Sequence, residues 1–111
     1  CDRLLLYLRA AEDGGPPAVL RAFLIELRDH PGLAKLFLAD FDRHDQGMRA
    51  VGQAFADQFA SMLAPQARSP LGRIGVIGAL LWIARRWIED GFEESMESVK
   101  EAILDFAAAA R

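Results

Sequence analysis

The sequence has no threonine, no asparagine and only four valines, although these residues are typical of β-strands and of the tight turns that join them. Nineteen alanines and eleven arginines, which favour helices, are present instead, together with many leucines and glutamates. No segment alternates strictly between apolar and polar residues, as a half-buried strand would. The composition therefore predicts an all-α fold.

Cysteine, long apolar runs and an excess of positive charge are also missing. Cys1 is the only cysteine, so no internal disulfide can form. The longest strongly apolar run covers about ten residues, 74–83, whereas a membrane-spanning helix needs roughly 20. Thirteen basic against 16 acidic residues leave a net charge of −3, and Arg85-Arg86 is the only adjacent basic pair. We expect no membrane span, no direct binding of nucleic acid by this chain and a cytoplasmic location.

Proline, glycine and serine divide the 111 residues into about six predicted helices within a single domain, residues 1–111. Prolines 17, 31, 65 and 70 mark where helices begin or where the chain leaves one, and Ser69 and Ser95 stand where N-caps are expected. The expected helical ranges are 2–12, 17–29, 31–41, 46–64, 70–90 and 96–110.

The fourth predicted helix has an amphipathic pattern with an aromatic apolar face. Its apolar residues recur at intervals of three and four, which places them on one side of a helix: Met48, Val51, Phe55, Phe59 and Met62. Ordinary core packing explains such a face. An adaptable apolar ligand pocket also explains it, since Met and Phe side chains repack around varied shapes. The pocket hypothesis takes its residues from two helices: Phe37, Phe41, Phe55, Phe59 and Met62.

The last two predicted helices carry more apolar residues than one core-facing side needs. Residues 71–88 are apolar almost all round, and Gly75, Gly78 and Trp82 lie opposite the side that holds Leu80 and Ala84. A second copy of the chain could cover that face, or the helix could be central within one monomer. The final helix has a narrow apolar seam that could pack on its own neighbour or complete a four-helix bundle across a two-fold axis: Met96, Val99, Ile103, Phe106 and Ala110.

No arrangement of residues indicates catalysis, a metal or a cofactor. Asp40 and His44 would need one continuous helix to share a metal, and we expect a break between them. Neither His30 nor His44 has the nucleophile and orienting group that a catalytic histidine needs. Gly72, Gly75 and Gly78 follow no strand and do not form a phosphate-binding loop. We expect no enzymatic activity.

Two stretches of the sequence resemble a known family. Residues 75–109, GVIGALLWIARRWIEDGFEESMESVKEAILDFAAA, resemble the C-terminal end of TetR-type transcriptional regulators. Residues 16–41, PPAVLRAFLIELRDHPGLAKLFLADF, with the long helix that follows, resemble the middle of the same regulatory domain. The resemblance rests on helix order and apolar pattern, and it covers nearly the whole chain.

The resemblance implies a homodimer in which the last two helices pair with their counterparts as a four-helix bundle. The candidate dimer residues are then Gly75, Gly78, Trp82, Val99, Ile103 and Phe106. It also implies a cavity among the preceding helices for a small apolar or aromatic effector, and a regulator, more often a repressor than an activator, that releases DNA when the effector binds. The family's N-terminal helix-turn-helix, roughly fifty residues, is absent from this chain, so DNA would be bound only through that domain.

Two other functions fit the same patterns. A helical protein-interaction module would use its apolar faces to bind a partner helix and would need no small-molecule ligand. An all-α enzyme would need a deep cleft in which His44 and carboxylates converge.

Overall fold

The computed structural model describes residues 2–35 and 46–110, and within that part of the chain the structure is helical with no strand. Helix α1 spans Asp2–Ala10, a short 3-10 helix η1 spans Glu12–Gly14, and α2 spans Pro16–Asp29. Residues 31–35 are helical, and then come α4 (Gln46–Leu63), α5 (Pro70–Glu89) and α6 (Met96–Ala109). The all-α prediction is confirmed. Candidate residues Phe37 and Phe41, and the pair Asp40 and His44, lie outside the described residues.

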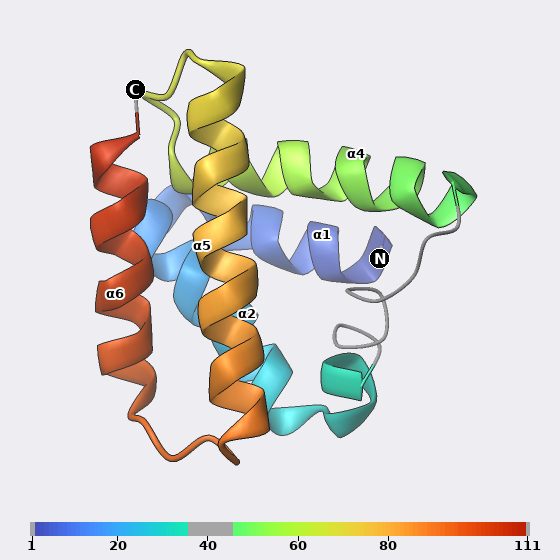
Figure 1. Ribbon diagram of the computed structural model, residues 1–111, viewed down its shortest axis with the longest axis vertical. Helices are drawn as coiled ribbons and strands as arrows, with labels where there is room; N and C mark the ends of the chain where they lie inside the picture. The colour runs from blue at the N-terminus through green and yellow to red at the C-terminus, as the bar shows by residue number, and fades with distance from the viewer. Residues whose placement is uncertain (1, 36–45, 111) are drawn as a thin grey trace.

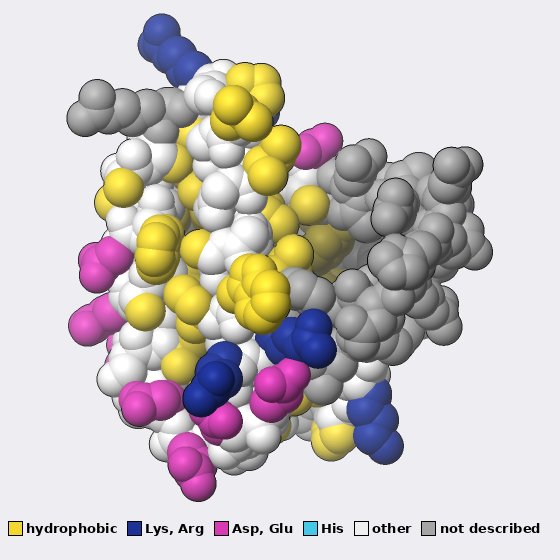
Figure 2. All heavy atoms as spheres, viewed as in Figure 1, with side chains coloured by type: hydrophobic (Ala, Val, Ile, Leu, Met, Phe, Trp, Pro, Cys, Tyr) yellow, Lys and Arg dark blue, Asp and Glu magenta, His cyan; other side chains and the backbone are white. Residues whose placement is uncertain are grey.

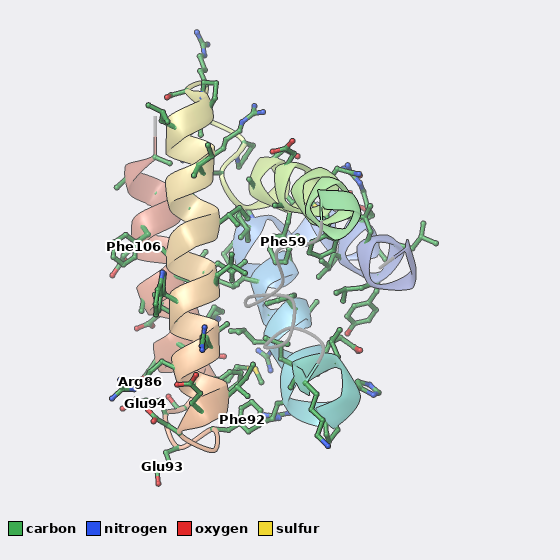
Figure 3. The ribbon with its side chains drawn as sticks, turned by 45° about the vertical axis from the view of Figure 1, so that its right-hand side comes forward. Phe59, Arg86, Phe92, Glu93, Glu94 and Phe106 are labelled. Carbon is green, nitrogen blue, oxygen red and sulfur yellow. The ribbon has the colours of Figure 1, made fainter. Side chains whose placement is uncertain are left out.

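The helices form two layers (Figures 1 and 3). Helices α5 and α6 lie side by side in one layer, and α1, α2 and α4 make up the other. Contacts link the layers through α4 with α5 and through α2 with α6. The molecule measures 34 × 31 × 23 Å along its principal axes. One broad side of the α5–α6 layer is therefore turned away from the rest of the chain.

The capping residues explain where the last two helices begin. The hydroxyl of Ser69 accepts a hydrogen bond from the Gly72 amide at 3.4 Å, and Pro70 occupies the first turn of α5. The hydroxyl of Ser95 accepts one from the Ser98 amide at 3.1 Å at the start of α6. Both start points agree with the sequence prediction. The first helix is shorter than predicted, because the chain tightens into η1 after Ala10.

The core lies between the two layers and consists mainly of apolar side chains from α1, α2, α4, α5 and α6. Phe59 of α4 is fully buried, and its ring lies edge-on to Phe23 of α2 at 4.8 Å and to Phe55 at 5.7 Å between ring centroids. Among the described residues no polar or charged side chain is buried. Burial of apolar surface is therefore the main source of stability here.

Candidate interface on helices α5 and α6

Helix α5 is apolar on two sides, and only one of them faces the core. Its buried side chains recur at intervals of four, four and three residues: Val76, Leu80, Ala84 and Trp87. On the outer side Leu71 is 77% exposed, Ile74 64% and Trp82 66%. Large apolar side chains this exposed in one group mark an interaction surface more often than ordinary surface.

Helix α6 adds Phe106 to the same surface. Its buried residues are Val99, Ile103 and Ala107, spaced by four, and Phe106 stands one residue before the last of these. At 100° per residue Phe106 lies 100° from Ala107 and about 20° from Val99, which places it at the edge of the buried side of the helix. Its side chain is 57% exposed. Within one chain the predicted seam of Met96, Val99, Ile103, Phe106 and Ala110 is divided, because Val99 and Ile103 are buried and Phe106 is exposed. Its part in a four-helix bundle across a two-fold axis stays a prediction.

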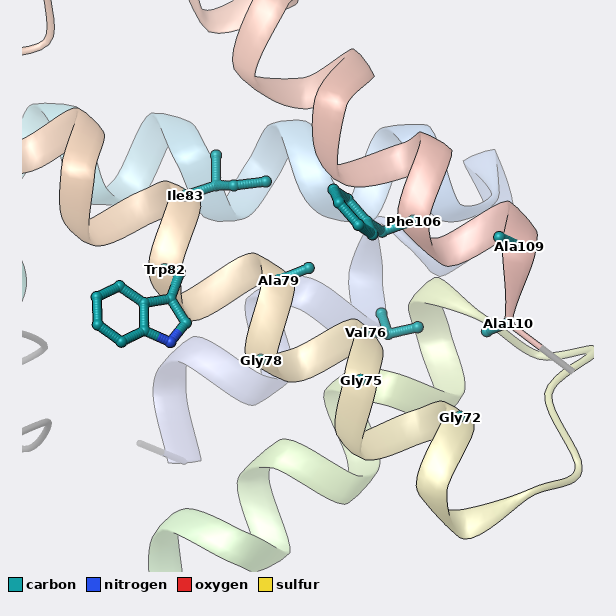
Figure 4. Close-up of a pocket in the computed structure, with 10 residues that line it drawn as sticks. All are labelled: Gly72, Gly75, Val76, Gly78, Ala79, Trp82, Ile83, Phe106, Ala109 and Ala110. Carbon is teal, nitrogen blue, oxygen red and sulfur yellow. The ribbon is translucent and has the colours of Figure 1, made fainter.

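A hollow of about 550 Å³, open to solvent, lies between the two helices (Figure 4). Small residues of α5 form much of its lining, with larger side chains at its edges: Gly75, Gly78, Ala79, Trp82, Ile83 and Phe106. Figure 2 shows apolar side chains gathered along this side of the molecule, over α5 and α6. We call the exposed residues Leu71, Ile74, Gly75, Trp82 and Phe106, together with the partly exposed Gly78, the outer face.

Apart from Arg73, the charged residues of α5 lie near its C-terminal end and form ion pairs there. Arg85 Nε lies 2.8 Å from a carboxylate oxygen of Glu89, and Arg86 Nε lies 3.1 Å from one of Asp90. Both pairs have the (i, i+4) spacing that lets side chains meet on a helix surface. The outer face is therefore apolar along the first three turns of α5 and has internally balanced charge beyond them.

Contacts from the connecting segments lie at both ends of the α5–α6 pair. At one end the indole N–H of Trp87 donates to the Glu94 carbonyl at 2.8 Å, and the Trp87 ring lies edge-on to Phe92 at 4.8 Å. At the other end the Gln66 side-chain amide donates to the carbonyls of Ala107, at 2.8 Å, and Ala110, at 3.3 Å. The two helices that form the outer face are therefore linked to the neighbouring connections at both ends.

The candidate dimer residues occupy two environments. Gly75, Gly78, Trp82 and Phe106 lie on the outer face and line its hollow. Val99 and Ile103 are 5% and 0% exposed and belong to the core beneath it. A second copy that docked on the outer face would contact the first four residues and not Ile103.

The candidate pocket residues that the structure describes are packed together. Phe59 is fully buried, Met62 is 3% exposed, and Phe55 is half-buried against the same cluster, in contact with Phe59. Phe23 of α2, which the sequence analysis did not select, completes this aromatic group. Its position near the middle of an apolar helical run was the available signal.

Leu71 and Ile74 are outer-face residues that the sequence analysis did not select. A helical wheel places Leu71 within about 40° of Gly75, Gly78 and Trp82, which was enough to group it with them. Ile74 lies at the border of that group.

The described residues contain no group of three or more His, Cys, Asp or Glu side chains that could hold a metal ion. His30 lies at the end of α2, where its Nε2 is 3.3 Å from a carboxylate oxygen of Glu26. No helix in the described ranges is both long and apolar enough to cross a membrane.

Comparisons of the chain with protein-family models, with curated proteins and with solved structures find no match.

Proposed function

We propose that residues 1–111 are the homodimerisation and effector-binding part of a ligand-responsive transcriptional regulator of the TetR type, most simply a repressor. The observation that carries this proposal is the outer face of α5 and α6. The TetR-like sequence pattern suggests pairing through the last two helices, and in this structure those two helices leave Trp82 and Phe106 more than half exposed.

A second copy is a physically reasonable cover for this face. Two helices from each copy would bury their exposed apolar side chains as a four-helix bundle. Burial of apolar surface stabilises association by roughly 25 cal/mol per Å² before the entropic cost of binding is subtracted.

The effector would bind in the other layer, among the aromatic side chains of α4 and its neighbours. Phe55, Phe59 and Met62 offer a surface that is apolar and polarizable, which suits an apolar or aromatic molecule. In this proposal the effector favours a minor conformation in which these side chains separate and α1 tilts. DNA would be bound by a segment outside residues 1–111, and the tilt would alter the spacing of two such segments, ideally near one helical turn of DNA, roughly 34 to 36 Å.

The regulator proposal can be tested on the gene. The reading frame upstream of the Cys1 codon should encode roughly fifty residues with a basic helix-turn-helix, as the resemblance implies. An upstream sequence without such a segment would contradict the regulator proposal and leave the interaction-module function.

The pocket can be tested with the protein itself. Thermal unfolding in the presence of a panel of small aromatic compounds should reveal at least one that raises the midpoint. Phe59→Leu should then weaken that shift, whereas the matched change Phe106→Leu on the outer face should not. Equal shifts in both variants would place the site elsewhere.

A protein-interaction module without a small ligand is the second candidate. The complete burial of Phe59 and near-complete burial of Met62 favour it, since they describe a filled core rather than a void. An interaction module predicts that no compound of the aromatic panel raises the thermal midpoint. It also predicts that a partner protein binds to the outer face.

A further inference from the structure

Within the described part of the chain, no contact explains why positions 75 and 78 of α5 are glycine. Both lie inside α5, where glycine is less favourable than alanine because it loses more backbone freedom on folding. Neither has a positive φ, and a Cβ added at either position would meet no atom within 4 Å. The fold therefore offers no reason for glycine here, whereas close approach of another backbone would supply one.

These glycines are part of a symmetric pattern on the outer face. Leu71, Gly75, Gly78 and Trp82 are separated by four, three and four residues, and at 100° per residue they lie within about 60° of one another around α5. Along the helix, these four positions therefore hold a large side chain, two glycines and another large side chain. The pattern is therefore nearly unchanged when the helix is reversed about the midpoint between the two glycines.

We propose that this pattern is the contact between two copies of the chain, with their α5 helices antiparallel and a two-fold axis between Gly75 and Gly78. This inference rests on the proposed homodimer and specifies its register. In a two-fold interface, residue i contacts j while j contacts i. Gly75 of each copy then faces Gly78 of the other, the helix backbones approach closely there, and Leu71 of each copy packs against Trp82 of the other.

Charge favours a second copy as the occupant. Two chains of net charge −3 repel one another in general, so they can dock only through a face that carries little net charge. The first three turns of α5 are such a face, and the charges that follow are balanced as Arg85–Glu89 and Arg86–Asp90 pairs.

The size of the face is also adequate. Helices of 20 and 14 residues are about 30 Å and 21 Å long, and side by side they offer on the order of 500 Å² in projection. Because side chains protrude from the helices, the solvent-accessible area of this face is larger than its projected area. A standard stable interface takes about 800 Å² from each partner, which is of the same order.

Replacing the glycines tests the close approach. Gly75→Ala and Gly78→Ala should each raise the thermal midpoint of the dilute, monomeric chain, because alanine is the better helix former and its Cβ has open space. Each should also weaken dimerisation by about tenfold, because the added methyl separates the paired backbones. Gly32→Ala, whose Cβ would also meet nothing within 4 Å, is the matched control and should leave dimerisation unchanged.

A charge exchange tests the register. Leu71→Glu alone and Trp82→Lys alone should each weaken dimerisation, since each places an unpaired charge against an apolar side chain. The double variant Leu71→Glu/Trp82→Lys should recover at least part of the loss, because the two introduced charges face one another across the axis. Circular dichroism of all three variants checks that they keep their helices.

The outcomes separate this inference from the proposed function. If the unmodified chain dimerises but the glycine variants dimerise equally well and the double variant shows no recovery, the register is wrong and the dimer remains. If the unmodified chain is monomeric at every concentration, both the register and the proposed homodimer are wrong.

Discussion

At the scale of single residues, the two tryptophans of α5 show how one helix supplies both a core and an outer face. Trp82 is 66% exposed and Trp87 is 3% exposed. Five residues correspond to 500° of rotation, so the two indoles point about 140° apart. Trp87 lies in the core beside the α5–α6 connection, and Trp82 lies exposed on the outer face.

The buried indole makes a hydrogen bond that a phenyl ring cannot make. We predict that Trp87→Phe lowers the free energy of unfolding by about 1 to 2 kcal/mol, because the Glu94 carbonyl loses its donor and the smaller ring leaves space beside Phe92. Urea unfolding of the dilute chain measures this loss in the free energy of unfolding. Trp82→Phe on the outer face is the matched control and should change the same quantity by less than about 0.5 kcal/mol. Equal losses in the two variants would contradict this role for Trp87.

At the scale of helices, the stability of α6 depends on the hydrogen bonds of its first turn. The Ser95 hydroxyl caps the helix by accepting from the Ser98 amide, and it also lies 3.0 Å from the Ser98 hydroxyl. We predict that Ser95→Ala costs about 1 kcal/mol of stability, the usual cost of losing an N-cap. Ser98→Ala keeps the backbone amide that donates to the cap and should cost less. Urea unfolding of both variants checks the order, and a larger loss in Ser98→Ala would overturn it.

Glu97 joins the same first turn to α2. A carboxylate oxygen of Glu97 lies 2.7 Å from Lys100 Nζ, and another is 3.8 Å from an Arg21 guanidinium nitrogen of α2. The hydrogen bond from Lys100 and the Lys100 charge, with a further contribution from Arg21, lower the pKa of Glu97 below its ordinary value of 4.5.

This lowered pKa has a defined effect on stability. A carboxyl whose pKa is lower in the folded state stabilises the fold above its unfolded pKa, and the contribution is lost as the pH falls through the folded pKa. The contribution of Glu97 to the free energy of unfolding should therefore be complete at neutral pH and decline below about pH 4.5. Glu97→Gln should remove this component, so that the two proteins converge in stability at low pH. The effect should be small and should shrink in high salt, since the group is exposed.

Urea unfolding between neutral pH and about pH 3 measures this convergence. Glu101→Gln, an exposed change on the same helix, is the control and should not reproduce it. A constant difference between the unmodified protein and Glu97→Gln at all pH values would contradict the assignment.

Helix ends were more predictable than helix orientation. Ser69, Pro70 and Ser95 act within one turn of the chain, so their effects are readable from local sequence. The orientation of α6 was harder, because spacings of three and four both fit a helix and the pattern left open whether its apolar seam packs within the chain or against a second copy. The fold buries Ala107, and Phe106 joins the outer face.

The candidate interface was partly predictable for a related reason. Gly75, Gly78 and Trp82 share one side of α5 by rotation alone, whichever side the core selects. Val99 and Ile103 were assigned to the same interface, but burial depends on the packing of α6 against α2, which a single sequence does not encode locally. The prediction for Phe37 and Phe41 concerns residues outside the described part of the chain.

At the scale of the whole molecule, the proposed function assigns a different role to each of the two layers. The α1–α2–α4 layer encloses the aromatic cluster around Phe59, and the α5–α6 layer covers that cluster on one side and presents the outer face on the other. In this proposal a movement of α4 would reach the outer face through α5, because α5 contacts both α4 and α6. The account depends on the outer face being covered by a second copy.

The mass of the chain in solution tests that claim most directly. Light scattering or sedimentation from about 1 μM to about 1 mM should show a species near twice 12.3 kDa that gives way to monomer on dilution. Trp82→Lys should shift this transition to higher concentration, while Leu6→Lys, at a similarly exposed position on α1, should not. A single species of 12.3 kDa across the whole range would contradict the account.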